Sequence, residues 1–326
     1  MILKSMIIHE IKKEANTTNN ATVYKTNAVM DITNDSVEKI ITSLEKSFSK
    51  KTLRRAKFSD DGFKNKISNF SDINILNSSH ILVDNLKDRI NGISQAKGGY
   101  IVFAEYATNQ DFLAVFIVRN TDGSKLTPHA GNWDLDTTQY LDVEHFAMGV
   151  KINLTILNSP SDDRYISLIK GNTDISGYFE AWIGLDDPKQ ENKDAIALYN
   201  ISTQIELPSG MTDRDELKKM IFDYTRGKTD RIVNLNELSQ YIYSDEDKIS
   251  QYCEENSIDI DGEFKINNSN LKRFYRISAK YNGIELTAPR SSFREDMIDF
   301  IDGKVIINSP ELVAKLRSEM NTNIDE

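Results

Sequence analysis

The chain has 326 residues, 39% of them hydrophobic and 28% charged, a composition that predicts a folded protein and excludes a largely disordered one. Its longest uninterrupted apolar run, residues 112–118, is far too short to span a membrane. The net charge of −10 argues against a protein that coats DNA by bulk attraction.

The amino-terminal segment has no recognisable secretory signal, because Glu10 interrupts its short apolar clusters. Cys253 is the only cysteine and cannot form an internal disulfide, which suits a reducing compartment. We therefore expect a cytoplasmic protein without a membrane segment.

Charge is distributed unevenly along the chain. Residues 1–57 carry 11 basic and 6 acidic side chains, and residues 264–294 carry 7 and 1. The intervening residues 58–263 carry 19 basic and 35 acidic side chains, and the tail from residue 295 carries 3 and 8. A molecule of this kind is polarised, so nucleic acid should meet only certain faces of it.

The first predicted elements are two short strands at residues 6–11 and 21–26. A helix then begins at Asp35, which has capping-box spacing with Glu38 and precedes apolar residues at helical intervals. A second helix is predicted over residues 79–95. Its inward-facing residues are predicted to be Ile81, Leu82, Leu86 and Ile90.

Four further strands are predicted after the second helix. Residues 100–106 and 112–118 are too apolar for half-exposed strands, so they predict central strands that are buried on both faces. The other two strands are predicted at residues 147–154 and 164–169.

Gly171 is predicted to turn the chain into a helix over residues 174–184. A domain boundary is predicted directly afterwards, where Asp186, Asp187 and Pro188 follow one another. The fold class expected is α+β. Residues 1–186 should form a mostly antiparallel sheet flanked by helices, and residues 187–326 a smaller helical domain with two β-hairpins.

The elements of the second domain are predicted from helix-capping residues and turn residues. The residues expected to cap its helices are Thr212, Ser244 and Ser309. Pro310, directly after the last of them, suits the first position of a helix. The dipeptides expected to turn its hairpins are Asn282-Gly283 and Asp302-Gly303.

One acidic group with a histidine could hold a metal ion, as in a metal-dependent nuclease or hydrolase. Its members are Asp134, Asp136, Asp142 and His145. We favour a structural interpretation, in which Asp134 and Asp136 cap or turn a loop and Asp142 hydrogen-bonds the His145 ring. The remaining histidines are scattered and no cysteine stands at ligand spacing, so we predict no metal site.

No nucleotide-binding or nucleophile motif is present. The segment Lys170-Gly171-Asn172 precedes a predicted helix start, where backbone N–H groups could hold a phosphate, but a strand-to-helix turn needs a glycine there anyway. Cys253 lies in an amphipathic helix pattern that favours a buried, unreactive thiol. The sequence therefore predicts no catalytic residues, no cofactor and no enzymatic activity.

Two basic segments are the candidate DNA-binding sites. The first, the 46–57 patch, consists of Lys46, Lys50, Lys51, Arg54, Arg55 and Lys57. The second, the 272–280 patch, consists of Lys272, Arg273, Arg276 and Lys280. Aromatic residues interleave the second patch, a mixture able to contact phosphates and to stack on bases. In the first patch we expect Lys50, Arg54 and Arg55 to face solvent.

Two segments in the middle of the chain carry a family resemblance. They read YLDVEHFAMGVKINL at residues 140–154 and RYISLIKGNTDISGYFEAWIGL at residues 164–185, with a weaker echo, RSSFR, at residues 290–294. The chain resembles the 37-kDa nucleoid-associated proteins of the NdpA type, and its mass of 37.1 kDa fits. The resemblance implies a bacterial nucleoid protein and brings no defined catalytic residues with it.

The function predicted from the sequence is association with the bacterial nucleoid, through DNA backbone contacts with little sequence preference. One alternative is a protein-interaction adaptor whose acidic middle binds basic partners, so that DNA association is indirect. Another is the metal-dependent nuclease or hydrolase. The sequence leaves the formation of homo-oligomers open.

Overall fold

The structure is a computed structural model that describes residues 1–17, 20–67, 69–91, 93–129, 132–169, 173–186, 190–293 and 297–322. Two compact units make up the chain. Unit 1 contains Met1–Ala197 and Val233–Phe264, and unit 2 contains Leu198–Ile232 and Lys265–Glu326. Asp187 and Pro188 lie outside the described residues, and the division into domains at that point stays a prediction.

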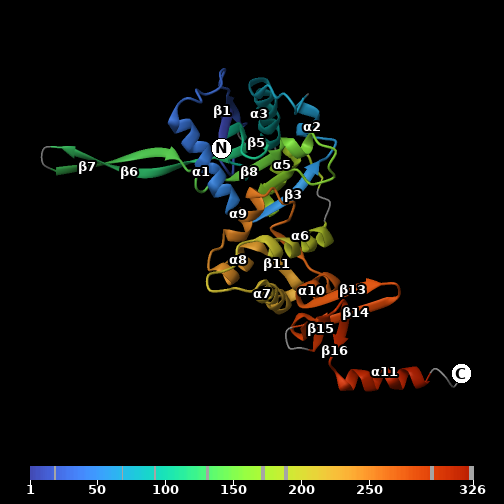
Figure 1. The fold of residues 1–326 in the computed structure, drawn as a ribbon. Coiled ribbons are helices and arrows are strands. Elements are labelled where there is room, and N and C mark those ends of the chain that lie inside the picture. Colours follow the sequence, from blue (N-terminus) through green and yellow to red (C-terminus); the bar gives the residue numbers. More distant parts are fainter. Residues whose placement is uncertain are drawn as a thin grey trace. The chain divides into compact units, whose positions relative to one another are not determined.

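Unit 1 is built on an eight-stranded sheet in the order β10-β3-β9-β8-β5-β4-β1-β2 (Figure 1). Its strands are β1 Ile2–Lys12, β2 Thr22–Tyr24, β3 Leu53–Phe58, β4 Gly99–Ala107, β5 Asp111–Val118, β8 Met148–Asn153, β9 Ile166–Ile169 and β10 Leu185–Asp186. Every neighbouring pair is antiparallel, which confirms the predicted α+β class with a mostly antiparallel sheet.

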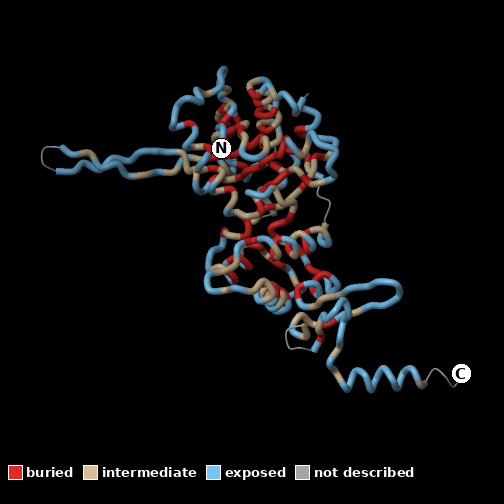
Figure 2. Tube along the Cα trace, in the orientation of Figure 1, coloured by how far each residue is buried: buried red, intermediate tan, exposed pale blue. Residues whose placement is uncertain are grey.

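Helices cover both faces of this sheet. Along β5, Val115 belongs to a core that also contains residues of α3 (Ile75–Asn91) and α5 (Thr173–Ile183). Its neighbour Phe116 belongs to a second core with residues of α1 (Asp35–Ser49). Because successive strand residues point to opposite faces, the seven-residue apolar run serves both cores. The prediction of central strands buried on both sides is confirmed (Figure 2).

A long two-stranded ribbon lies between β5 and β8 in the sequence, although these two strands are neighbours in the sheet. Its strands, β6 (Asn120–His129) and β7 (Asn132–Leu141), pair only with each other and extend away from the rest of unit 1 (Figure 1). Nearly all of its described residues are exposed or half-buried (Figure 2). The ribbon was not predicted. Asp134 and Asp136 therefore lie on a strand, and our expectation that they cap or turn a loop is wrong.

The rest of unit 1 includes the short helices α2 (Phe63–Lys66) and α4 (Leu154–Leu157). The chain also returns to unit 1 through α8 (Leu235–Tyr243) and α9 (Lys248–Glu255). The chain passes from one unit to the other inside three elements, which are α6 Glu191–Gln204, β11 Ile232–Asn234 and β12 Glu263–Lys265.

Unit 2 combines helices with two hairpins, as predicted. Its elements are α7 Arg214–Gly227, η1 Thr229–Arg231, α10 Asn268–Tyr275, β13 Arg276–Tyr281, β14 Ile284–Pro289, η2 Arg290–Phe293, β15 Ile298–Ile301, β16 Lys304–Ile307 and α11 Pro310–Thr322. Each hairpin turns through an Asn-Gly or Asp-Gly pair in which both residues have positive φ, as a type I′ turn requires.

The first helix, α1, begins at Asp35 as predicted, but several predicted caps and other helix starts are displaced. Asn34, not Asp35, caps α1, and Asp213, not Thr212, caps α7, because their side chains accept the first free N–H groups. Ser244 ends α8 with left-handed backbone instead of starting α9. In α3, which begins four residues early, Ile81 is 49% exposed and was wrongly placed inside. Gly171, Lys170 and Asn172 lie outside the described residues.

A buried histidine makes the stability of unit 1 depend on pH. His9 has no exposed surface; its Nε2 bonds Ser79 Oγ at 2.8 Å, and its Nδ1 accepts from the Thr26 N–H at 3.2 Å. Burial, aided by the neighbouring His80 and Lys25, lowers the pKa of His9 from 6.5 to about 4. The folded state therefore resists protonation in a pH range where the unfolded chain accepts a proton.

This stabilisation is fully present above pH 6.5 and is lost as the pH falls toward 4. Between about pH 7.5 and pH 5, we expect the free energy of unfolding to fall by about 2 kcal/mol through His9 alone. Urea titrations of the parent and of His9→Gln isolate this contribution, since all other titrating groups are shared. Equal pH dependence in the two proteins would show that His9 titrates normally.

Candidate nucleic-acid interface

The 46–57 patch spans the end of one helix and a strand of the main sheet. Lys46 lies in the last turn of α1, and Lys50 is the residue that caps it. Arg54, Arg55 and Lys57 lie on β3, between β9 and β10. The basic run was not recognised as a strand, because its charged residues resemble a solvated surface segment.

Carboxylates of unit 1 pair with four of the six cations in this patch. Lys50 bonds Asp247 at 3.1 Å, and Arg54 bonds Glu180 at 2.9 Å. Arg55 bonds Glu254 at 2.5 Å, and Lys57 bonds Asp162. A cation that already has a carboxylate partner releases fewer counterions when it meets a phosphate. The patch is therefore less positive than its sequence indicates.

Arg55 departs furthest from the expectation that it faces solvent, because its side chain is only 11% exposed. It shares Glu254 with Lys151, which also lies 3.3 Å from Glu45. Burial raises the pKa of Glu254, but the adjacent Lys151 and Arg55 outweigh it and lower this pKa to about 2. These residues form a buried ion network that supports the sheet.

A second buried group surrounds Arg164. Its guanidinium has no exposed surface and bonds Asp194 at 2.5 Å, Asp259 at 2.8 Å and Asp261 at 2.9 Å. Three carboxylates share this cation and Asp259 also bonds Lys193 at 3.0 Å, so the carboxylates still outnumber the cations. Burial, with the nearby Asp261, raises the pKa of Asp194 to about 6 even beside Arg164. This group is structural, because it joins the segment before β9 to α6 and to the segment before β12.

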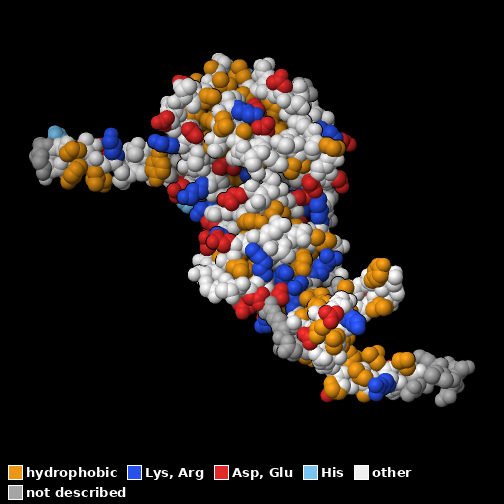
Figure 3. Space-filling model, in the orientation of Figure 1, with side chains coloured by type: hydrophobic (Ala, Val, Ile, Leu, Met, Phe, Trp, Pro, Cys, Tyr) orange, Lys and Arg blue, Asp and Glu red, His pale blue; other side chains and the backbone are white. Residues whose placement is uncertain are grey.

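The 272–280 patch lies wholly in unit 2. Lys272 and Arg273 are exposed on the last turn of α10, while Arg276 and Lys280 lie on β13. Among the described residues, none of these four has an ion-pair partner. In Figure 3, lysine and arginine side chains gather in the part of unit 2 near α10, while aspartate and glutamate side chains lie over α7. The four cations are therefore available to external anions.

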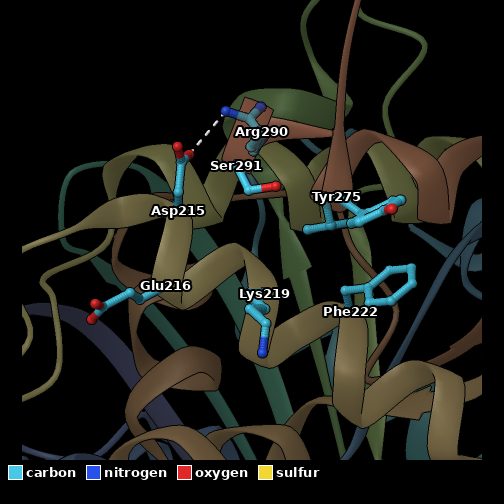
Figure 4. A pocket seen from close by; sticks show the side chains of 8 residues that line it. Asp215, Glu216, Lys219, Phe222, Tyr275, Arg290 and Ser291 are labelled. Atoms are coloured by element: carbon cyan, nitrogen blue, oxygen red, sulfur yellow. Dashed lines mark hydrogen bonds and ion pairs between the residues drawn. The ribbon is translucent and has the colours of Figure 1, made fainter. Parts of the chain in front are cut away.

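A cavity of about 330 Å³ lies in the same unit. Its lining residues come from α7, α10 and η2, and are Asp215, Glu216, Lys219, Phe222, Phe274, Tyr275, Arg290 and Ser291. The Phe222 and Tyr275 rings stack with centroids 5.1 Å apart on one side, and the pair Asp215–Arg290 lies on the other (Figure 4). Arg290 belongs to the RSSFR segment, of which Arg294 lies outside the described residues.

The acidic residues near the ribbon do not form a metal centre. Asp142 Oδ1 bonds the His145 ring at 3.1 Å, as our structural interpretation expected. Asp134 bonds His129 instead, at 2.9 Å. Within the described ranges, no group of three or more histidine, cysteine or acidic residues is arranged to hold a metal ion. Burial raises the pKa of the Cys253 thiol to about 12, so a thiolate is not formed at neutral pH.

Comparison with known proteins identifies the family. The model of the family described as nucleoid-associated protein YejK matches residues 7–310. The chain belongs to this family. A nucleoid-associated protein of Histophilus somni (strain 2336) is 25% identical over 243 residues, which is 70% of each chain. Similar proteins of Cronobacter sakazakii and Serratia proteamaculans are each 22% identical, over 66% and 78% of both chains.

The family membership confirms the resemblance seen in the two central segments, and with it a nucleoid-associated role in bacteria. No helix in the described part of the chain is both long enough and apolar enough to cross a membrane.

Proposed function

We propose that this nucleoid-associated protein binds duplex DNA directly, without catalysis, through phosphate contacts made by the 272–280 patch. Lys272, Arg273, Arg276 and Lys280 present four cations on one helix and the strand that follows it. Contacts of this kind go to the DNA backbone and carry no base sequence, so little sequence preference is expected.

The observation that carries the proposal is the difference in pairing between the two basic patches. Four cations of the 46–57 patch are neutralised by carboxylates of unit 1. Those of the 272–280 patch have no such partners within the described residues, and residues 264–294 contain only one acidic residue, Glu285. The 272–280 patch therefore provides the stronger field for a polyanion.

Charge reversal in the 272–280 patch should weaken DNA binding in a salt-dependent way. If its four cations meet four phosphates, affinity for any duplex should fall about 10²-fold between about 50 and 200 mM salt. The triple variant Lys272→Glu, Arg273→Glu, Lys280→Glu should lose most of that affinity on every sequence alike. Its salt slope should be flatter by about 0.9 for each lost contact. Fluorescence anisotropy with labelled duplexes measures both quantities.

The matched control reverses three lysines on and beside α1, as Lys39→Glu, Lys46→Glu, Lys51→Glu. It makes the same change in net charge and should bind nearly as the parent does. If the control loses binding and the 272–280 variant does not, the DNA contact belongs to the 46–57 patch. If the parent itself binds no duplex, direct contact is excluded.

A protein-interaction role is the second candidate, and the ribbon supports it. Leu126 pairs with Leu135 across the ribbon, and Trp133 lies on the same face; each of the three is at least 60% exposed. The ribbon contains three aspartates, Asp122, Asp134 and Asp136, but only one lysine, Lys125. Its net charge is therefore negative, which is unsuited to binding DNA. Recruitment through a basic partner protein would leave the purified chain without affinity for DNA, which the same titration detects.

A further inference from the structure

We propose that the cavity of unit 2 holds an unpaired nucleobase, so that the protein recognises single-stranded DNA as well as duplex. The proposal rests on the proposed DNA contact, because the same basic patch would hold the flanking phosphates. The cavity, the aromatic residues and the cations all belong to unit 2.

The cavity has the size and lining of a small-molecule site. Its volume of about 330 Å³ lies at the lower end of the range typical of ligand pockets, and aromatic side chains form much of its wall. Phe274 lines the cavity, is almost fully buried and has a T-shaped ring neighbour, Tyr199, whose centroid is 5.5 Å away. Phe222 is half-buried and Tyr275 is 40% exposed, so a planar ligand can reach the parts of this stacked pair that the two rings do not cover in each other.

Polar groups inside the cavity favour a ligand that carries hydrogen-bond acceptors. Arg290 bonds Asp215 at 2.9 Å and the Tyr199 hydroxyl at 3.0 Å, which fixes its guanidinium against α7. Its buried Nε has no hydrogen-bond partner among the described residues. A donor left unsatisfied in this way is suited to an acceptor supplied from outside, such as a base carbonyl or ring nitrogen.

The charged residues that line the cavity are balanced in number, with Asp215 and Glu216 against Lys219 and Arg290. Burial, together with the charges of Arg290 and Arg214, lowers the pKa of Lys218, whose Nζ lies 3.8 Å from Asp215. Asp215 is thus held by two cations and adds little repulsion against an anionic ligand. Glu216 is exposed at the edge, where solvent screens it.

The sequence around Tyr275 supplies the phosphate contacts that a strand would need. Lys272, Arg273 and Arg276 all lie within three residues of this ring, and the Arg276 guanidinium carbon is 5.6 Å from its centroid. Aromatic side chains interleaved with cations are the recurring means by which proteins bind single strands, because every base has a face that can stack. A base inside a duplex cannot reach the cavity, whereas an unpaired base can.

The test compares single-stranded and duplex DNA on the full-length protein. The variant Tyr275→Leu keeps apolar volume but removes the ring, and it should weaken single-strand binding by about 5- to 150-fold, the scale of one lost stacking contact. Tyr275→Phe keeps an aromatic ring and should bind single strands as tightly as the parent does. The control Tyr281→Leu removes an aromatic ring that is 77% exposed at the β13–β14 turn and should change nothing.

Fluorescence of a 2-aminopurine placed in a short single strand gives a second readout, since stacking on a protein ring changes its emission. We expect the change with the parent and with Tyr275→Phe, and none with Tyr275→Leu. Duplex affinity should be equal in all four proteins.

The outcomes separate the two proposals. If duplex binding depends on the 272–280 patch but Tyr275→Leu binds single strands like the parent, the base-binding cavity is wrong and the backbone contact stands. If single strands bind through Tyr275 while duplex does not bind, the duplex proposal fails and the cavity stands. If the parent binds neither, both proposals fall.

Discussion

Replacing Arg164 by leucine is expected to destabilise the protein by about 3–5 kcal/mol, the cost of removing one partner from a buried ion pair. The change leaves Asp194, Asp259 and Asp261 in a buried site with their central cation removed. Asp194 already has one oxygen, Oδ2, without a hydrogen-bond partner among the described residues. Urea unfolding at neutral pH measures the loss.

The neighbouring Lys193, which bonds two aspartates nearer the surface, provides the control for Arg164→Leu. Lys193 bonds Asp163 at 2.6 Å and Asp259 at 3.0 Å, but its side chain is 40% exposed, so Lys193→Met should cost less than about 1 kcal/mol. The deficit of Arg164→Leu should shrink as the pH falls from 7.5 to 5, because protonated aspartates no longer repel one another. If both variants lose a similar free energy of unfolding, water must solvate the three aspartates once Arg164 is removed.

Substituting valine for Gly184 should destabilise unit 1 by at least about 1–3 kcal/mol, the scale of a residue forced into sparsely populated backbone geometry. Gly184 has a φ of +75°, and a Cβ there would lie 2.2 Å from the Asp61 carbonyl oxygen. Gly62, with a φ of +74°, approaches Ile183 equally closely. Two backbones therefore meet where α5 ends, and neither can accept a side chain.

Gly177 lies within α5, the helix that Gly184 directly follows, and supplies the matched control. Outside its own helix, no heavy atom of the described residues lies within 4 Å of where a Cβ would stand, and its φ is not positive, so Gly177→Ala should be neutral or should stabilise by about 0.5–1 kcal/mol. Thermal unfolding of the two variants compares them directly. An unchanged melting temperature for Gly184→Val would contradict the close approach of the two backbones.

Local sequence signals predicted the parts of the fold that depend on neighbouring residues. The apolar run over residues 112–118 predicted a strand buried on both faces, and the Asn-Gly and Asp-Gly pairs predicted both hairpins of unit 2. The ribbon over residues 120–141 escaped prediction because both of its faces meet solvent, so its polar residues do not alternate regularly with apolar ones.

The candidate sites depend on contacts between residues that are far apart in the sequence, and no local sequence pattern predicts such contacts. Arg55 resembled a surface residue because its partner Glu254 lies 199 positions further along the chain. The cavity of unit 2 brings Phe222 on α7 to Tyr275 on α10, a contact that neither helix pattern indicates alone. The only sequence signal for this cavity was the mixture of aromatic and basic residues at 272–281. That mixture begins on α10, the helix that carries Tyr275.

The order in which unit 1 is assembled from the chain has a consequence for its synthesis on the ribosome. The last residues of this unit, Val233–Phe264, emerge only after Leu198–Ile232 of unit 2. Asp259 follows Arg164 by 95 positions, so the Arg164 guanidinium has only Asp194 of its three carboxylate partners until Asp259 and Asp261 are made. Domains usually fold in turn as they emerge, but the amino-terminal unit here must wait for most of the chain. A ribosome stalled before Val233 would therefore carry all eight strands of the sheet but would lack α8, α9 and the two aspartates that complete the Arg164 site.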